Sequence, residues 1–529
     1  MTGPFVNLGQ VAAHHARERP DAIAFAFEGR TTSFGAFAAR CRRVAAALVA
    51  DGCRPGARVA FLGKNSDLFF ELLFGAGMVG LVTVPLNWRL APAEHEQILA
   101  DARADLLFAT ADFAAAAGRL ALDALGVRRL VEIEPGDDPD RHFTAWRDVR
   151  GAAADTGADT AVAVGRDDVF LQLYTSGTTG RPKGVMLTHG SVLGALELAG
   201  EGAEPWRQWT PDLTALVAMP VFHVSGSGWA LGAFHGGGRS VILREFSISG
   251  VERAIAADGV THVMIVPAAL QMLVDSWERG TAQAGSLRQI VYGASPMPPV
   301  LLNRCLALLG CDFVQYYGMT ETCGSFVALS PEDHLQPVGN RLGSTGRVMT
   351  GHALRIVDAG GAAVPAHVVG EVCVRTPGVM AGYWNMPEAT CETIDADGWL
   401  HTGDAGYLDD DGYLFLCDRI KDMIISGGEN IYPIEVEQAL ASHPAVDAVA
   451  VIGIPDERWG ESVKAFVVLK PGAATQAEEL VAHARTAIAG YKVPRSVDFV
   501  ATLPRNASGK ILKRELRAAH RTASDSALA

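Results

Sequence analysis

The sequence has no pair of cysteines at the Cys-x-x-Cys spacing, and its eight cysteines are scattered over 529 residues without any metal-ligand spacing. This pattern favours free thiols in a reducing cytoplasm. Positive charge is also scarce, because 59 acidic residues outnumber 45 basic ones and give a net charge of -14. A chain with this charge is not expected to bind nucleic acid or an anionic membrane surface as its main partner.

Long hydrophobic runs are missing as well. The most apolar run, residues 72–86, is interrupted by glycines and contains Pro85. It is shorter than the roughly 18 residues that a membrane span needs, so it predicts a buried helix followed by a strand. The amino terminus has no basic segment followed by an apolar one, which predicts no signal peptide. We therefore expect a cytoplasmic protein without stable membrane insertion.

The chain is long and apolar enough for more than one core, since 49% of its residues are hydrophobic. Strand and helix patterns alternate over residues 58–133 and again over 213–317, which predicts parallel sheets covered by helices. The predicted fold class is α/β. A large N-terminal domain, residues 1–417, is expected to hold two stacked α/β layers and a small antiparallel β unit at 343–417. Residues 418–529 predict a small α+β C-terminal domain.

Periodicity and breaker residues predict individual elements. Helices are expected at 6–19, 33–50, 66–79, 92–101 and 112–118, and Ser33 is the expected N-cap of the second. A further helix is expected to begin at Pro433. Another is expected to follow a capping box of Thr475 and Glu478 and to end at Ala489. Strands are expected at 22–27, 58–62, 81–85, 105–109, 128–133, 169–173, 214–219, 239–243, 262–266, 289–292, 312–315, 446–454 and 463–469. Residues 134–168, rich in Gly, Asp and Ala, predict a surface connection.

The densest cluster of hydroxyl groups and glycines runs from Tyr174 to Val185, Tyr-Thr-Ser-Gly-Thr-Thr-Gly-Arg-Pro-Lys-Gly-Val. An apolar strand precedes it and a helical pattern follows, so strand, loop and helix have the layout of a phosphate-binding loop. Glycines allow close backbone approach to an anion, hydroxyls donate to phosphate oxygens, and a lysine supplies positive charge. The Gly-Lys-Ser/Thr ending of a Walker A loop is absent. The residues predicted to bind phosphate are Thr175, Ser176, Gly177, Thr178, Thr179, Gly180 and Lys183.

This stretch resembles the signature loop of the adenylate-forming superfamily, which comprises acyl- and aryl-CoA synthetases, adenylation domains of peptide synthetases, and luciferases. Other motifs follow in the family's order, so that the resemblance covers about residues 5–517. The loop at residues 426–433 is most similar to that of fatty-acyl and related acyl-CoA ligases. The resemblance implies an acid–CoA ligase that forms an acyl-adenylate with pyrophosphate release and then an acyl-CoA with AMP release.

The resemblance also implies a role for several strand-to-loop motifs. Tyr-Gly-Ala-Ser at 292–295 would lie against adenine, and Tyr-Tyr-Gly-Met-Thr-Glu at 316–321 would supply an aromatic ring, a phosphate contact and, through Glu321, a Mg²⁺ ligand. Asp404 and Arg419 would bond the ribose hydroxyls. The positions assigned to nucleotide binding are Gly293, Ala294, Ser295, Tyr316, Tyr317, Gly318, Met319, Thr320, Asp404, Arg419 and Lys421.

Two further positions concern the acid and the C-terminal domain. His223 resembles the family residue that orients the acyl group or gates its entry, and Lys510 the lysine that bridges carboxylate and phosphate oxygens. Because Lys510 lies in the C-terminal domain, the resemblance implies that this small domain is mobile and closes with a hinge at Asp418. In a second closure, Gly427 and Gly428 would line the pantetheine tunnel. The implied catalytic residues are Thr178, His223, Glu321 and Lys510.

The implied ligands are ATP, Mg²⁺, coenzyme A as cosubstrate and a small-molecule carboxylic acid, and a homodimer is left open. The expected acid-lining segments 223–229, 266–270 and 318–325 are small or apolar, with Gly226, Gly228, Ala294 and Gly324 expected to keep the pocket open. This favours a medium- or long-chain fatty acid or an aromatic acid. Three alternatives remain: a stand-alone adenylation enzyme that loads a carrier protein, a luciferase-like oxygenase, and a catalytically silent nucleotide-binding sensor.

Overall fold

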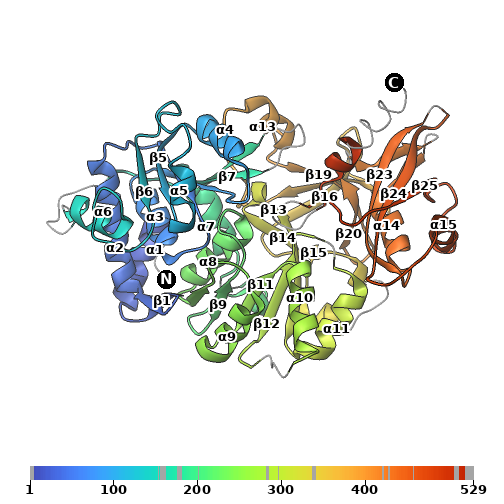
Figure 1. Cartoon of the computed structure of the whole chain (residues 1–529), viewed down its shortest axis with the longest axis horizontal. Helices are drawn as coiled ribbons and strands as arrows, with labels where there is room; N and C mark the ends of the chain where they lie inside the picture. Colours follow the sequence, from blue (N-terminus) through green and yellow to red (C-terminus); the bar gives the residue numbers. More distant parts are fainter. Residues whose placement is uncertain are drawn as a thin grey trace. The chain divides into compact units, whose positions relative to one another are not determined.

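The protein is described by a computed structural model in which two compact units are distinguished (Figure 1). The first unit comprises residues 1–342, 348–353 and 375–400, and the second comprises residues 343–347, 354–374 and 401–529. The structure describes residues 5–152, 154, 162–175, 182–200, 202–280, 285–295, 297–335, 341–419, 422–426, 429–456, 458–505 and 511–518. The domain boundary and hinge expected at Asp418 stay predictions.

The first unit contains the two predicted α/β layers. One sheet has five neighbouring parallel strands and an antiparallel edge. Its spatial order is β18 (Gly382–Tyr383), β8 (Lys183–Thr188), β7 (Val169–Thr175), β4 (Val82–Leu86), β3 (Arg58–Leu62), β5 (Ala104–Ala109) and β6 (Arg129–Glu132). Its helices include α3 (Asp67–Met78), α4 (Pro92–Ala102) and α5 (Ala111–Ala117). The predicted strand–helix alternation of residues 58–133 is confirmed.

The second sheet of this unit is also largely parallel. Its order is β14 (Gly324–Leu329), β13 (Asp312–Met319), β12 (Gln289–Gly293), β11 (His262–Ile265), β9 (Thr214–Val217), β10 (Arg239–Ile242), β1 (Ile23–Phe27) and β2 (Arg30–Ser33). The associated helices are α7 (His189–Glu197), α8 (Val224–His235), α9 (Ile248–Asp258), α10 (Pro267–Trp277), α11 (Pro299–Leu309) and α12 (Pro331–Leu335). The N-terminal hairpin β1–β2 was predicted, but its pairing with β10 depends on contacts far away in sequence.

A cluster of phenylalanines joins the two sheets. Phe25 on β1 stacks on Phe70 of α3 and on Phe234 of α8, with ring centroids 5.1 and 5.7 Å apart. Phe74 of α3 also meets Phe234, at 4.8 Å. All of these rings are buried, and each buried aromatic side chain contributes a large apolar area. Helix α3 lies between the layers, and this explains why nearly all of its sides are apolar. The apolar run at 72–86 predicted such a buried helix.

Helix starts follow the capping residues that the sequence offers. Ser33 caps α2 (Phe34–Ala50) and accepts a hydrogen bond from the Ala36 N–H at 3.3 Å, which confirms the prediction. Helix α1 (Leu8–Glu18) lies within the predicted range. The surface connection expected at 134–168 is wrong in part, because it contains α6 (Phe143–Arg150). The helix is short, and its two large apolar residues, Phe143 and Trp146, become recognisable as a buried face only through their tertiary contacts.

The second unit contains an antiparallel sheet and a smaller α+β part. The strands of the antiparallel sheet follow one another in the spatial order β16 (Ala353–Val357), β17 (Gly370–Arg375), β19 (Leu400–Leu408), β20 (Tyr413–Arg419) and β15 (Gly346–Val348). The other sheet is formed by β22 (Glu429–Ile431), β21 (Ile424–Ser426), β24 (Gly460–Leu469) and β23 (Val446–Asp456), with β25 (Ser496–Phe499) paired to β24. Both the antiparallel unit and the α+β pattern were predicted.

The helices of the second unit are α14 (Pro433–Ala441) and α15 (Ala477–Arg485). Pro433 opens α14, as predicted. The predicted capping box before α15 is wrong, since the Thr475 hydroxyl donates to the Glu479 carboxylate at 2.7 Å instead of capping the backbone. Helix α15 is also shorter than expected. The remaining helix, α13 (Pro387–Thr393), belongs to the first unit.

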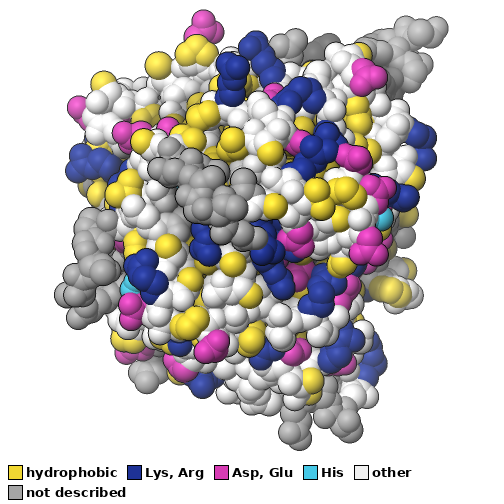
Figure 2. Space-filling view, turned by 90° about the vertical axis from the view of Figure 1, so that its left-hand side faces the viewer, with side chains coloured by type: hydrophobic (Ala, Val, Ile, Leu, Met, Phe, Trp, Pro, Cys, Tyr) yellow, Lys and Arg dark blue, Asp and Glu magenta, His cyan; other side chains and the backbone are white. Residues whose placement is uncertain are grey.

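The surface in Figure 2 carries lysine and arginine side chains interspersed with aspartate and glutamate. On this face the negative net charge is therefore not gathered into a patch of one sign. Within the described part of the chain, no helix combines the length and apolarity that a bilayer crossing requires. The cytoplasmic location and the homodimer stay predictions.

A buried ion pair anchors α6 and gives a stability prediction. Arg147 Nη1 lies 2.7 Å from Glu71 Oε2, and their side chains are 8% and 1% exposed. Burial raises the pKa of Glu71, while Arg147 and Arg40 oppose the rise. Arg147→Met should lower the free energy of unfolding by about 3 kcal/mol, because it leaves a buried carboxylate without its main partner. Denaturant unfolding measures the loss.

The destabilisation by Arg147→Met should be smaller at pH 5 than at pH 8. A carboxyl whose folded pKa is raised becomes neutral as the pH falls, and a neutral carboxyl no longer requires the guanidinium. The control is Arg288→Met, which breaks an exposed pair with Asp212, 60% and 65% exposed, and should change stability little. A loss as small as that of the control, or one that does not depend on pH, contradicts this role of the pair.

Candidate active site

The two strands that flank the predicted phosphate loop form a hairpin. β7 and β8 are antiparallel, and Thr175 at the end of β7 faces Lys183 at the start of β8. The expected order of strand, loop and helix is therefore wrong, because β8 intervenes before α7 begins at His189. Lys183 is consequently fixed at its backbone by a strand ladder.

The Lys183 side chain lies against Tyr383, a residue that the sequence analysis did not identify. Its ammonium nitrogen is 4.5 Å from the centroid of the Tyr383 ring, within the range of a cation–π contact. The Tyr383 hydroxyl in turn donates a hydrogen bond to Glu321 Oε1 at 2.8 Å. Tyr383 is thus the common partner of the predicted phosphate lysine and the predicted metal carboxylate. No local pattern around Gly382–Tyr383 indicates this role.

Backbone hydrogen bonds hold these three side chains in place. The Glu321 residue belongs to the short 3₁₀ helix η3 (Thr320–Thr322), and its carbonyl accepts from the Met380 N–H at 2.8 Å. The Trp384 N–H donates to the Gly184 carbonyl, also at 2.8 Å. The segment around β18 therefore binds to η3 on one side and to β8 on the other. Glu321 and Tyr383 are both buried, so the position of the carboxylate is well defined.

The predicted adenine segment and the tyrosine motif lie side by side. β12 and β13 are parallel, and Gly293 faces Tyr316 in their register. A Cβ atom on Gly293 would lie 2.3 Å from the Tyr316 carbonyl oxygen, so the chain requires glycine there. Ala294 follows with φ 66° and is exposed. Gly293 ends β12 at the edge of the sheet where α/β proteins bind ligands, and Tyr316 lies beside it near the end of β13.

The two tyrosines of the motif have different surroundings. As neighbours on β13, Tyr316 and Tyr317 point to opposite faces of the sheet. The Tyr316 ring centroid lies 6.4 Å from that of Trp206, and burial raises the pKa of Tyr316 to about 12. Tyr317 meets Phe326 edge-to-face at 5.0 Å. The role of Tyr317 as an adenine contact stays a prediction.

His223 lies at the N-terminal boundary of α8, and its ring meets that of Phe222 with centroids 4.6 Å apart. Its Nε2 atom is buried and has no hydrogen-bond partner among the described residues, and the same holds for Trp229 Nε1. Burial, aided by the positive charge of Arg89, lowers the pKa of His223 to about 4. The imidazole is therefore neutral at pH 7, so it can orient a ligand through a hydrogen bond but adds no positive charge.

The small residues expected in the acid-lining segments differ in openness: among the described residues, a Cβ atom would meet nothing within 4 Å at Gly324 and only Val224 Cγ2, at 3.5 Å, at Gly228. A Cβ atom on Gly226 would lie 2.2 Å from the Pro220 carbonyl oxygen, so this glycine serves close packing of α8 and not an open pocket. Trp229 is buried against Trp209, with ring centroids 4.7 Å apart. Trp206 and Trp209 were not identified from the sequence. Both are recognisable in the sequence as aromatic residues, but no sequence pattern near them indicates a contact with α8 or β13.

The predicted ribose residues belong to the second unit. Asp404 on β19 faces Arg419 on β20 in the antiparallel register, so the two positions are cross-strand neighbours as their motifs suggested. Nine predicted site residues lie outside the described residues. They are Ser176, Gly177, Thr178, Thr179, Gly180, Lys421, Gly427, Gly428 and Lys510.

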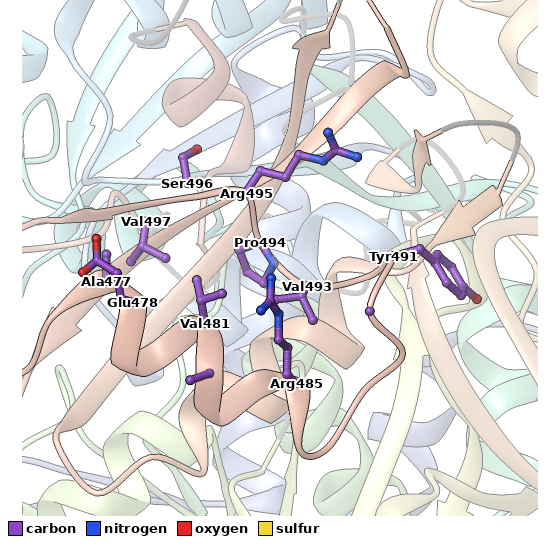
Figure 3. A pocket seen from close by; sticks show the side chains of 12 residues that line it. Ala477, Glu478, Val481, Arg485, Tyr491, Val493, Pro494, Arg495, Ser496 and Val497 are labelled. Atoms are coloured by element: carbon purple, nitrogen blue, oxygen red, sulfur yellow. The ribbon is translucent and has the colours of Figure 1, made fainter.

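A surface pocket of about 640 Å³ also lies in the second unit, between α15 and the segment that leads to β25 (Figure 3). Its lining includes Glu478, Val481, Arg485, Tyr491 and Arg495. None of the predicted site residues lines it. The pocket is therefore distinct from the candidate active site.

Family models and known proteins match almost the whole chain. The model described as "AMP-binding enzyme" matches residues 12–384, and the model of the AMP-binding enzyme C-terminal domain matches residues 435–510. A fatty acid–[acyl-carrier-protein] ligase of Streptomyces coeruleorubidus is 41% identical over 96% of both chains. A feruloyl-CoA synthase of an Amycolatopsis species is 41% identical over 96% of this chain and 98% of its own.

A solved structure shows the same similarity. The o-succinylbenzoate coenzyme A synthetase of Bacillus subtilis, in complex with ATP and magnesium ion, is 32% identical and has a TM-score of 0.81. The match covers 96% of this chain and 98% of that chain. The α/β architecture is thus shared over nearly the full length of both proteins.

The contacts of Tyr383 predict that this residue contributes to the binding of Mg²⁺ and ATP. Tyr383→Phe keeps the ring under Lys183 but removes the hydroxyl that orients Glu321. The Mg²⁺ concentration needed for half-maximal ATP binding should rise about tenfold, the usual effect of losing one hydrogen bond to a charged group. Tyr383→Leu removes the cation–π contact as well, but Lys183 is expected to leave the ring when it binds a phosphate, so binding of ATP without metal should not weaken. Fluorescence or calorimetric titrations measure both effects.

Tyr491→Phe is the matched control, because Tyr491 is 50% exposed and does not belong to the candidate active site. It should leave both titrations unchanged. Thermal melting of each variant separates a loss of folding from a loss of binding. If Tyr383→Phe binds Mg²⁺ and ATP as the unmodified protein does, the hydroxyl has no positioning role.

Proposed function

Because the chain belongs to the AMP-binding enzyme family, we propose that it is an ATP-dependent acid–CoA ligase. It activates a carboxylic acid as an acyl-adenylate, with release of pyrophosphate, and transfers the acyl group to coenzyme A, with release of AMP. The observation that carries the proposal is the contact of Tyr383 with both Lys183 and Glu321. It supports a site in which the Lys183 ammonium binds the polyphosphate and the Glu321 carboxylate binds the metal ion of the same ATP molecule.

The residues fit ATP and Mg²⁺ by their chemistry. Glu321 offers a buried carboxylate oxygen ligand, the type that Mg²⁺ prefers. Lys183 contacts no carboxylate within the described part of the chain, so its charge is available for a phosphate. Mg²⁺ supplies neutralisation of the polyphosphate charge that would otherwise repel an incoming carboxylate. Gly293 lets β12 approach β13 closely, and adenine is proposed to bind beside the exposed Ala294 that follows it.

The chain's own residues bind and orient the reactants and need not provide a nucleophile. In the first step an oxygen of the substrate carboxylate bonds to the α-phosphorus, and the bond from that phosphorus to the pyrophosphate oxygen breaks. Lys183 stabilises the charge of the leaving pyrophosphate, and Lys510 is proposed to bridge the carboxylate and the α-phosphate. Asp404 and Arg419 are proposed to hold the ribose. In the second step the thiol of coenzyme A attacks the acyl carbon and AMP leaves.

The acid is proposed to be aromatic or a medium- or long-chain fatty acid. Two expected acid-lining positions have aromatic partners or neighbours: Trp229 on α8 meets Trp209, and Trp206 meets Tyr316 on β13, next to the segment 318–325. The buried Trp229 Nε1 and His223 Nε2 are polar groups that a substrate oxygen could satisfy. The names of the two relatives, a fatty acid ligase and a feruloyl-CoA synthase, support the same two classes.

Isotope exchange between ATP and pyrophosphate tests the proposal directly. With a panel from hexanoate to palmitate and including cinnamates, at least one acid should drive exchange, and AMP release should then depend on coenzyme A. Exchange without any thioester formation favours a carrier protein as acceptor, which a phosphopantetheinylated carrier in place of coenzyme A identifies. Nucleotide binding without exchange for any acid would overturn the ligase assignment in favour of a silent sensor.

A variant of Lys510 separates the two half-reactions. Lys510→Ala should reduce adenylate formation by at least about a hundredfold, the usual loss when a donor to a developing charge is removed. It should leave thioester formation from supplied acyl-adenylate largely intact, because that step is proposed to use the 427–428 loop after a second closure of the domain. Rapid-quench measurements of each half-reaction give both rates. Equal losses in the two steps contradict the two-closure scheme.

A further inference from the structure

Three metal-ligating side chains converge on neighbouring strands of the second unit. Glu371 and Cys373 lie two residues apart on β17, which places them on the same face of the strand. His401 lies near the start of β19, the next strand in the sheet. His401 Nδ1 is 2.8 Å from Glu371 Oε2 and 3.4 Å from Cys373 Sγ. The three potential ligand atoms all lie within 4.8 Å of one another.

The geometry excludes a nucleophile–base–acid relay. In such a relay the histidine receives the thiol proton on one ring nitrogen and is held by a carboxylate at the other. Here the carboxylate and the sulfur both approach the same nitrogen, Nδ1 of His401. Three different ligand atoms that approach one point are instead typical of groups that share a metal ion.

We propose that Glu371, Cys373 and His401 form a binding site for a divalent transition-metal ion of the zinc class. Thiolate, imidazole and carboxylate are the ligands that Zn²⁺ takes in proteins, with a fourth position for water. Cys373 is fully buried, whereas the His401 and Glu371 side chains are 25% and 24% exposed. Water can therefore reach the open side of the site. Mg²⁺ avoids sulfur ligands, so this site is chemically separate from the proposed ATP–metal site.

Hydrogen bonds around the cluster hold its ligands. Glu371 Oε1 accepts from the Gly403 N–H at 3.0 Å, which leaves Oε2 directed at His401. The Thr402 hydroxyl donates to the Val372 carbonyl at 2.8 Å and fastens β19 to β17 between the ligands. Such outer contacts orient metal ligands and strengthen binding. They also connect the site with the turn that leads to Asp404.

Cobalt(II) binding to the full-length protein tests the proposal, because a cobalt–thiolate bond gives a near-ultraviolet charge-transfer band that other ligands do not. Titration without nucleotide should produce this band with one equivalent of Co²⁺, and Zn²⁺ should abolish it by competition. Cys373→Ser should remove the band, and His401→Asn should weaken Co²⁺ binding. Cys391→Ser, which changes an exposed cysteine, is the control and should keep the band.

The result that overturns the proposal is the absence of a thiolate band in the unmodified protein, or its persistence in Cys373→Ser. Because Cys373 is buried and its replacement can disturb folding, Glu371→Gln provides an independent variant at a partly exposed position. It should keep the melting temperature of the metal-free protein but lower Co²⁺ affinity and shift the band. Unchanged affinity and band in Glu371→Gln exclude the carboxylate from the site. These outcomes do not depend on ligase activity.

Discussion

The candidate active site depends on one tyrosine that contacts two groups of opposite charge. Lys183 on β8 and Glu321 on η3 are far apart in the sequence, yet Tyr383 contacts both. Its ring face attracts the ammonium group and its hydroxyl orients the carboxylate. These two contacts support the proposal that Lys183 binds a phosphate and that Glu321 binds its metal ion.

Backbone constraints determine where these side chains lie. β8 pairs with β7 on one side and with β18 on the other, so the phosphate-loop lysine and Tyr383 share a sheet. The close approach of Gly293 to the Tyr316 carbonyl brings the adenine segment to the tyrosine motif. The phenylalanines between α3, α8 and β1 hold the two sheets together. The described part of the predicted site thus comes from strands of both sheets and the short helix η3.

The sequence predicted those features that depend on local chemistry. Ser33 before an amphipathic pattern indicated a helix start, and Pro433 another. The motifs around Lys183, Gly293, Tyr316 and Asp404 were found because each combines special residue types within a few positions. Features that depend on distant contacts were missed. Helix α6 is recognisable only once Trp146 is seen to be buried, and β8 only once it pairs with β7. Neither Tyr383 nor the cluster of Glu371, Cys373 and His401 has a spacing that a sequence pattern could reveal.

We propose that Lys183 and Glu321 bind one metal–polyphosphate and that Tyr383 positions both side chains. A crystal structure of the protein with Mg²⁺ and a non-hydrolysable ATP analogue is the decisive measurement. We expect the Lys183 ammonium to have moved from the tyrosine ring to the phosphate oxygens. We also expect Glu321 to bind the metal ion, directly or through water, and to keep its hydrogen bond from Tyr383. A bound nucleotide with Lys183 still on the ring and Glu321 remote from the metal would disprove this role of the two residues.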